Sequence, residues 1–172
     1  MNMKDKLDNI RVLLTDVDGV LTDGGMYYTN DGDVMKRFHT RDGMGITLLR
    51  KIGIPTIIIT KEKTKFVRLW AKKMKVENVF DGVDEKEKIL TIICKKYHIS
   101  AKQVAYIGDD VNDMKLLKIV GYSATPYDGT NEVKKIVNHI CKNKGGEGVL
   151  REIADMIRES QIKKKYNPSL YK

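Results

Sequence analysis

Short apolar runs alternate along this chain with segments in which apolar residues recur at helical spacing. Residues 10–15, 54–60 and 104–108 form continuous apolar runs, and residues 122–124 form a weaker one. Continuous runs of this length are typical of strands buried on both faces of a sheet. Strands that alternate with helices predict βαβ units and an α/β fold with a central parallel sheet. The segments with helical spacing are residues 45–51, 64–73, 86–97, 112–120 and 149–158.

One segment breaks this alternation near the N-terminus. Residues 26–28 and 34–38 flank a loop that contains Asp-Gly, which favours a β-hairpin. We therefore expect a hairpin at about residues 24–38, inserted between the first strand and the first helix. Residues 161–172 are polar and basic, and we expect them to form a tail that orders only on contact. The folded domain would then span residues 1–160.

Composition narrows the class of protein. The chain has 172 residues, of which 41% are hydrophobic and 32% charged, which is the balance of one soluble globular domain. No apolar run approaches the roughly 20 residues of a membrane span, and the N-terminal segment lacks the apolar core of a secretion signal. Cys94 and Cys141 lie far apart and form no CxxC pair. These features predict a cytoplasmic protein with no membrane partner.

Basic residues exceed acidic ones and give a formal net charge of +9. A basic surface attracts anions, from nucleic acids to small phosphorylated metabolites, and a solvated lysine-rich surface explains the excess equally well. Only 7% of residues are aromatic, and the sequence carries no nucleic-acid-binding signature. We therefore expect no nucleic-acid partner. The three histidines, His39, His98 and His139, are too scattered to predict a metal triad.

Polar residues that could bind a ligand or take part in catalysis follow the first two apolar runs. Asp16 and Asp18 follow the first run, and Gly19 lets the chain bend there, so both carboxylates can reach one site beyond the strand. A polar turn with a capping aspartate is the structural alternative. Thr60 ends the second run, where a hydroxyl can hold a phosphate oxygen, and Lys86 begins a predicted helix. A lysine near aspartates and a phosphate would balance their charges.

A second acidic cluster follows the third run. Asp109, Asp110 and Asp113 place three carboxylates within five residues. Such like charges repel unless a cation or a lysine neutralises them, and oxygen ligands of this kind suit Mg²⁺. A helix cap at Asp110 or Asn112 is the structural alternative. Capping alone does not explain two acidic clusters at two strand ends.

Together these residues resemble the four motifs of the haloacid dehalogenase superfamily of phosphotransferases, over roughly residues 8–160. The motifs stand in order as Asp-x-Asp-Gly at residues 16–19, Thr60, Lys86, and Gly-Asp-Asp-x-x-Asp at residues 108–113. The first and fourth motifs in combination are highly specific. The resemblance implies a Rossmann-like three-layer sandwich with a central parallel sheet.

The resemblance also implies a mechanism. Asp16 would be the nucleophile that forms an aspartyl-phosphate, and Asp18 would first donate and then accept a proton. Mg²⁺ would be held by the Asp16 carboxylate, the Asp18 backbone carbonyl and Asp109. Asp110 and Asp113 would surround this metal shell. Two further residues would bind the phosphate oxygens: Thr60 and Lys86.

The chain has no room for a large cap domain between its motifs, and three segments are similar to one capless branch of the superfamily. These segments are residues 16–27, 106–113 and 145–152. The branch hydrolyses phosphate esters of 2-keto-3-deoxy sugar acids. Its hairpins pack together into a homotetramer, in which a neighbouring subunit helps to cover each site. The resemblance therefore implies a phosphorylated sugar acid as substrate and a homotetramer as the assembly.

Two substrate classes compete within the branch: 3-deoxy-manno-octulosonate 8-phosphate, and the nine-carbon 9-phosphates of sialic acid and its deaminated relative KDN. Octulosonate enzymes usually carry Thr-Gly-Arg after the second strand, where this chain has Thr-Lys-Glu. A glutamate at this position, Glu62, is similar to the residue found in the nine-carbon enzymes and in the phosphatase-like module of acylneuraminate cytidylyltransferases. Asn112 favours the same class. Trp70 stands where a basic residue for the substrate carboxylate is expected. The substrate contacts implied are Glu62, Lys63 and Arg68.

A catalytically silent oligomerisation module associated with sialic acid activation is the alternative from another class, because fused relatives share the fold. Such a module has no need for both Asp16 and Asp18, so the intact motifs argue against it. Trp70 has an alternative too, since a lone tryptophan at helical spacing is more often part of the core.

Overall fold

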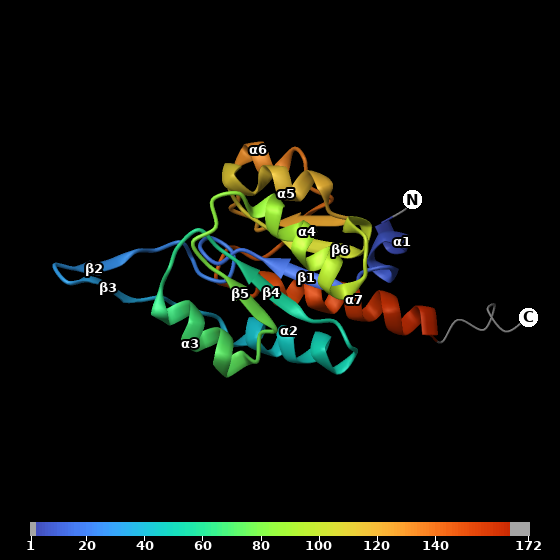
Figure 1. Ribbon diagram of the computed structural model, residues 1–172, viewed down its shortest axis with the longest axis horizontal. Coiled ribbons are helices and arrows are strands. Elements are labelled where there is room, and N and C mark those ends of the chain that lie inside the picture. The colour runs from blue at the N-terminus through green and yellow to red at the C-terminus, as the bar shows by residue number, and fades with distance from the viewer. Residues whose placement is uncertain (1–2, 166–172) are drawn as a thin grey trace, which may run out of the picture.

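The computed structural model describes residues 3–165, and its centre is a parallel β-sheet (Figure 1). The sheet strands are β1 Val12–Thr15, β4 Thr56–Ile59, β5 Asn78–Phe80, β6 Val104–Ile107, β7 Tyr122–Thr125 and β8 His139–Ile140. They lie in the order β5-β4-β1-β6-β7-β8, and every neighbouring pair is parallel. The predicted parallel α/β sheet is confirmed, with β1 in its interior.

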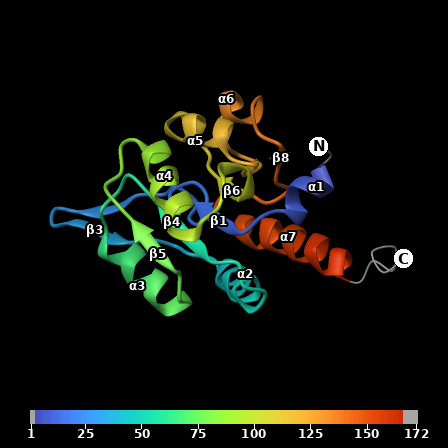
Figure 2. The same cartoon turned by 45° about the vertical axis from the view of Figure 1, so that its right-hand side comes forward.

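Helices cover both faces of the sheet (Figures 1 and 2). Successive strand residues point to opposite faces, so Leu13 joins one apolar cluster whereas Val12 and Leu14 join the other. Helices α1, α2, α3 and α7 contribute to the first cluster, and α4, α5 and α6 to the second. Their bounds are α1 Met3–Asp8, α2 Thr40–Lys51, α3 Lys65–Met74, α4 Lys86–Tyr97, α5 Met114–Ile119, α6 Asn131–Lys134 and α7 Val149–Lys165, with short 3₁₀ turns η1 Ala101–Gln103 and η2 Val111–Asp113. This arrangement is the expected three-layer sandwich.

The predicted hairpin is present as an arm that projects beyond the sandwich (Figure 1, left). Its strands, β2 Tyr27–Thr29 and β3 Gly32–Met35, pair antiparallel, with an irregularity between Tyr27 and Tyr28. Apolar side chains on the arm remain exposed, including Met26, Val34 and Met35. Within residues 3–165 nothing larger than this arm is inserted, so the expectation that the chain has no large cap holds for the part described.

Helix α2 begins earlier than its sequence pattern predicts, at Thr40 rather than at residue 45. Gly43 and Gly45 weaken the helical signal of this segment because glycine has a low helix propensity. Both glycines are packing positions: a Cβ at Gly45 would press on the backbone of Arg151 in α7, and one at Gly43 would overlap Met74 of α3. The glycines therefore let α2 pack closely against two other helices.

Helix α7 continues past residue 160, the predicted end of the folded domain, to Lys165. The side chain of Ser160 bonds to Asp8, and Gln161 Nε2 donates to the Ile10 carbonyl at 2.8 Å. These bonds fasten α7 to the end of α1 and the start of β1, so residues 160 and 161 belong to the domain. Residues 166–172 of the predicted tail lie outside the described residues. None of the described helices is long and apolar enough to cross a bilayer.

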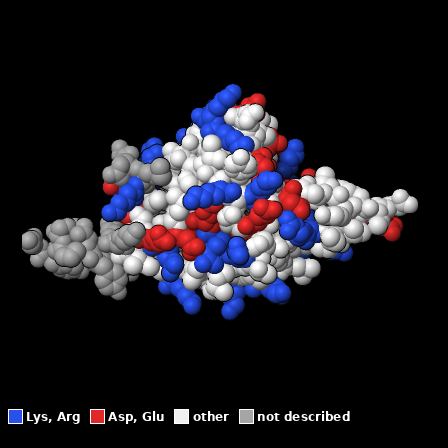
Figure 3. All heavy atoms as spheres, turned by 180° about the vertical axis from the view of Figure 1, so that it is seen from behind, with Lys and Arg blue, Asp and Glu red and all other residues white. Residues whose placement is uncertain are grey.

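The basic residues are dispersed on the face of the molecule that Figure 3 draws. On the face drawn in Figure 3, lysines and arginines alternate with aspartates and glutamates. The projecting arm, at the right of this view, carries few charged side chains. The charge pattern on this face is that of a solvated surface, and the arm differs from it in exposing apolar side chains.

Candidate active site

The two acidic clusters meet in one cleft beyond the carboxyl ends of the central strands. Asp16 follows β1, Thr60 follows β4, and Asp109 lies two residues after β6, so parallel pairing of these strands brings the three residues together. The cleft is lined by Asp16, Asp18, Gly19, Asp23, Gly24, Thr60, Lys61, Glu62, Asp109, Asp110, Asn112 and Asp128.

A buried ion-pair network forms the floor of the cleft. The ammonium of Lys86, at the first residue of α4, lies 2.7 Å from Asp16 and 2.6 Å from Asp113. The side chain of Lys86 is only 1% exposed, so its ion pairs with these two carboxylates offset the free-energy cost of removing the ammonium from water. The Tyr106 hydroxyl donates to Asp113 at 2.5 Å, and the same carboxylate accepts the backbone N–H of Asp109 at 2.9 Å. Asp113 thus orients both the lysine and the second acidic cluster.

The carboxylates are crowded enough to require a cation. Ligand oxygens of Asp16, Asp109 and Asp113 all lie within 4.8 Å of one another. Burial and the charge of Asp113 raise the pKa of Asp16 to about 7, and burial together with Asp16 and Asp113 raises the pKa of Asp109 to about 8. Burial opposes the charge of Lys86, but Asp16 and Asp113 outweigh it and raise the pKa of this lysine. With one lysine as the nearby cation, charging all of these carboxylates is unfavourable, and a further cation would favour their charged forms.

The donor set fits Mg²⁺. All the side-chain donors are carboxylate oxygens, which a hard divalent cation prefers. One oxygen of Asp18, Oδ2, is buried without a hydrogen-bond partner among the described residues. Gly19 has a positive φ of 81°, and a Cβ there would overlap the Asp109 carboxylate, so only glycine lets the two acidic segments approach this closely. The chain folds locally so as to gather these oxygens.

Sequence reasoning missed Lys36, which the structure places against Asp18. Lys36 follows β3 at the base of the arm, and its Nζ lies 2.5 Å from Asp18 Oδ1. Its side chain is 7% exposed, and the Thr22 hydroxyl donates to the same Asp18 oxygen at 3.2 Å. Nothing in the sequence distinguishes Lys36 from the many other lysines, because its contact depends on where the hairpin returns the chain beside the turn that follows β1.

The other predicted site residues divide into two groups. Thr60 and Glu62 line the cleft. Asp110 also lines the cleft. Its side chain accepts the Val111 N–H at 2.7 Å and so caps η2, which is the capping role considered for Asp110 from the sequence. Lys63 and Arg68 do not line the cleft. Arg68 instead forms a bidentate pair with Asp81 at 2.6 and 2.8 Å. In this chain Arg68 is therefore engaged by Asp81, and its contact with the substrate stays a prediction.

Trp70 is part of the apolar core, the alternative that its helical spacing suggested. Its ring stacks on Phe38 with centroids 4.6 Å apart and packs against the main apolar cluster. It does not line the cleft. The expected basic contact for a substrate carboxylate is therefore not supplied from this position of α3, and Lys61 is the basic residue that borders the cleft beside Thr60.

These features define an aspartate-based phosphotransferase site on a Rossmann-like sheet. Asp16 and Asp18 follow β1, Thr60 follows β4, and the second acidic cluster follows β6. Lys86 is buried between them. The sequence model of the haloacid dehalogenase-like hydrolases matches residues 46–153. The chain belongs to this family. Its membership confirms the superfamily and the fold that the four motifs predict.

Several relatives that resemble the chain in sequence and structure are 3-deoxy-D-manno-octulosonate 8-phosphate phosphatases. The 3-deoxy-D-manno-octulosonate 8-phosphate phosphatase of Haemophilus influenzae is 37% identical over 94% of this chain and 89% of its own length. The cobalt-bound structure of the phosphatase from that organism has a TM-score of 0.88 and 36% identity, covering 96% of this chain and 97% of the other. The Moraxella catarrhalis phosphatase, solved with magnesium, phosphate and KDO, has a TM-score of 0.90 and 30% identity, covering 98% and 97%.

Proposed function

We propose that this chain is a Mg²⁺-dependent phosphatase that removes the terminal phosphate of a 2-keto-3-deoxy sugar acid, with 3-deoxy-manno-octulosonate 8-phosphate as the preferred substrate. The observation that carries the proposal is the Asp16–Lys86–Asp113 network beside Asp109 in an open cleft. The octulosonate phosphatases that resemble the chain over most of its length support the substrate. A silent oligomerisation module would not need this network.

The reaction proceeds in two steps. In the first, the Asp16 carboxylate bonds to phosphorus, the ester P–O bond breaks, and Asp18 gives its proton to the departing sugar oxygen. In the second, Asp18 takes a proton from water, the water oxygen bonds to phosphorus, and the bond to Asp16 breaks to release phosphate. Asp16, Asp109 and the Asp18 carbonyl would hold Mg²⁺, which would supply positive charge to offset the phosphate oxygens. Lys86 and Thr60 bind the non-bridging oxygens.

The sugar acid itself is tested by direct comparison. We expect the purified chain with Mg²⁺ to release phosphate from the octulosonate 8-phosphate with a kcat/KM at least about tenfold above that for the two nine-carbon 9-phosphates, a difference of about 1.4 kcal/mol. Glu62 on the cleft wall favours the nine-carbon class, which is the second candidate. A reversed preference would assign that class, and equal slow turnover of all three would contradict both substrates.

Lys36 acts in this mechanism as a positioning residue for Asp18. Replacing Lys36 by alanine removes the buried partner 2.5 Å from the proton-transferring carboxylate, so we expect kcat to fall about 10- to 100-fold while KM changes little. The matched control is Arg37→Ala, since Arg37 is half-exposed and pairs with Asp23 instead. Steady-state kinetics of both variants test this role. Equal kcat in the two variants would contradict it.

The arm supports the homotetramer expected from the sequence. Met26, Val34 and Met35 are each about half exposed or more, which is unusual for apolar side chains grouped on one projection. We expect the double variant Val34→Glu, Met35→Glu to lower the mass measured by light scattering to that of a monomer, because buried charges without partners oppose association. Activity should fall with it, since a neighbouring subunit covers each cleft.

The free cysteines, Cys94 and Cys141, fit a reducing cytoplasm.

Ile92→Glu is the control for this experiment. Ile92 is also about half exposed but lies on α4, away from the arm. It should leave the mass and the activity unchanged. A wild-type chain that is monomeric and fully active would overturn the tetramer, and so would an arm variant that keeps the wild-type mass.

A further inference from the structure

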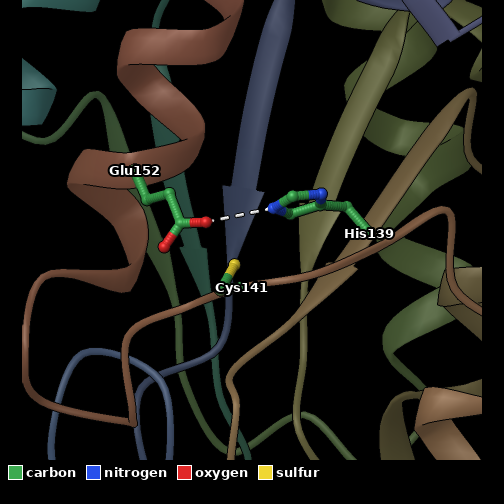
Figure 4. Close-up of side chains that lie close together, drawn as sticks. All are labelled: His139, Cys141 and Glu152. Atoms are coloured by element: carbon green, nitrogen blue, oxygen red, sulfur yellow. Dashed lines mark hydrogen bonds and ion pairs between the residues drawn. The ribbon is translucent and has the colours of Figure 1, made fainter.

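Three side chains with metal-binding atoms gather outside the cleft, between the last strand of the sheet and α7 (Figure 4). His139 belongs to β8, and the backbone N–H of Cys141 still pairs with Thr125 of β7, so the chain stays extended between them. Residues two apart in an extended segment point to the same side. Ile140 between them is therefore turned outward and is 45% exposed. Glu152, from the first turn of α7, faces the pair.

The ligand atoms lie at distances suited to one ion. His139 Nε2, Cys141 Sγ and a Glu152 carboxylate oxygen all lie within 4.8 Å of one another. His139 Nε2 and Glu152 Oε1 are 3.1 Å apart. Two ligands at about 2.05 Å from a zinc ion and separated by that distance subtend an angle of about 98°, which is near tetrahedral. The Cys141 sulfur lies within 4.8 Å of both atoms, and an approach of about 1.2 Å or less would bring it to the roughly 3.6 Å at which sulfur and nitrogen share a tetrahedral zinc ion.

We propose that His139, Cys141 and Glu152 form a second metal site, which binds a divalent ion of the zinc class. A nitrogen, a thiolate sulfur and one carboxylate oxygen form a borderline-soft donor set, which favours zinc over magnesium. The cleft of the proposed active site offers carboxylate oxygens instead. The two sites therefore select different metals.

The surroundings of Glu152 hold it ready for this role. Its carboxylate accepts the backbone N–H of Lys142 at 3.0 and 3.1 Å, and the backbone and side-chain amides of Asn143 at 3.3 and 3.2 Å. Contacts of this kind orient a ligand and are typical of the outer shell of metal sites. Water has access, because His139 and Glu152 line a surface cleft and can share the ion with a solvent ligand.

The charges around Cys141 also favour a cation. Cys141 is 1% exposed, and burial, with Glu152 and Asp42 nearby, raises the pKa of its thiol. Asp42 is fully buried, and its Oδ2 has no hydrogen-bond partner among the described residues. Arg151, a cation on the cleft wall, is already paired with Asp155 at 2.7 Å. On binding, the thiol gives its proton to solvent, a sulfur–metal bond forms, and no oxidation state changes.

An ion at this position would clamp β8 to α7 and so fix the loop that joins them. In this loop the Gly146 N–H donates to the Val20 carbonyl at 3.0 Å, and a Cβ at Gly145 would overlap the Gly19 carbonyl. The loop therefore packs directly on the turn that follows Asp18. We therefore expect metal binding at this site to make the protein more stable. The ligands of this site are different from the carboxylates that would hold Mg²⁺ in the cleft.

Cobalt titration tests the site, because Co²⁺ takes zinc geometries and a cobalt–thiolate bond gives a near-ultraviolet charge-transfer band. The full chain is titrated with Co²⁺ in saturating Mg²⁺. We expect a band that saturates at one equivalent, persists in Cys94→Ser and in Asp16→Asn, and is lost in Cys141→Ser. Cys94 is the matched control, as the other free cysteine in the chain. No band, or a band that survives Cys141→Ser, would overturn the proposal.

A second variant guards against misfolding at the buried cysteine. His139→Gln changes a partly exposed ligand and keeps the thiol, and we expect it to weaken Co²⁺ binding at least about 100-fold. Zn²⁺ should raise the melting temperature of the wild-type chain and of Cys94→Ser but not that of His139→Gln. An equal rise in the wild type and His139→Gln would contradict the site, whatever the activity of the proposed active site.

Discussion

Replacing Asp16 by asparagine will lower phosphate release from the octulosonate 8-phosphate by at least about 10³-fold. An amide cannot form the aspartyl-phosphate, and the substitution also removes one carboxylate from the proposed Mg²⁺ ligands. The fold should persist, because the amide oxygen can still accept the Val17 N–H that Asp16 Oδ1 accepts at 2.7 Å. Steady-state phosphate release and circular dichroism, measured on the same preparation, check both halves of this expectation.

The control for this substitution is Asp84→Asn. Asp84 is exposed and its ion pair with Lys61 is long, at 3.8 Å, so its replacement should leave turnover close to the wild-type value. Undiminished turnover in Asp16→Asn would remove Asp16 from the mechanism. Loss of turnover with loss of the circular dichroism spectrum would assign this residue a structural role instead.

Lys86→Ala should damage both stability and turnover. It leaves Asp16 and Asp113 buried without the ammonium that lies 2.7 and 2.6 Å from them. Removing one partner of a buried ion pair typically costs about 3–5 kcal/mol of unfolding free energy. Added Mg²⁺ should restore part of this stability, since it offsets the same carboxylates, but it should not restore turnover. Denaturant melts with and without Mg²⁺ measure the effect.

Lys88→Ala provides the comparison on the same helix. Lys88 is exposed and pairs with Glu85 one turn away, so we expect a change within about 0.5 kcal/mol. If Lys86→Ala were as stable as Lys88→Ala in the absence of Mg²⁺, the buried network would not hold the site together in the way we describe.

The central strands and the hairpin could be predicted because local pattern determines them. β1, β4 and β6 are fully buried on both faces, and each reads as a continuous apolar run. β5 and β8 could not be predicted in the same way. They are short edge strands with only partial burial, and their pairing with β4 and β7 creates them more than their own sequence does.

The residues of the candidate site could be predicted where their position at the end of a strand reveals them. Asp16 and Asp109 each follow a strand, and parallel pairing guarantees that such ends meet. Lys36 and the group at His139 could not be recovered, because their partners come from distant parts of the chain. The only local trace of that group is the spacing of His139 and Cys141, two apart in an extended run. The three histidines are scattered along the sequence, but His139 lies beside Cys141 and Glu152 in space.

The fastening of α1 to the last turns of α7 has a practical consequence for work on this protein. The two ends of the described chain leave the domain together, on the opposite side from the arm (Figures 1 and 2). The cleft lies toward the arm, beyond the carboxyl ends of the strands. A fluorophore attached on α1 or on the last described turn of α7 will therefore lie on the side of the domain away from the cleft and the arm, and a donor–acceptor pair placed on these two helices will separate on unfolding.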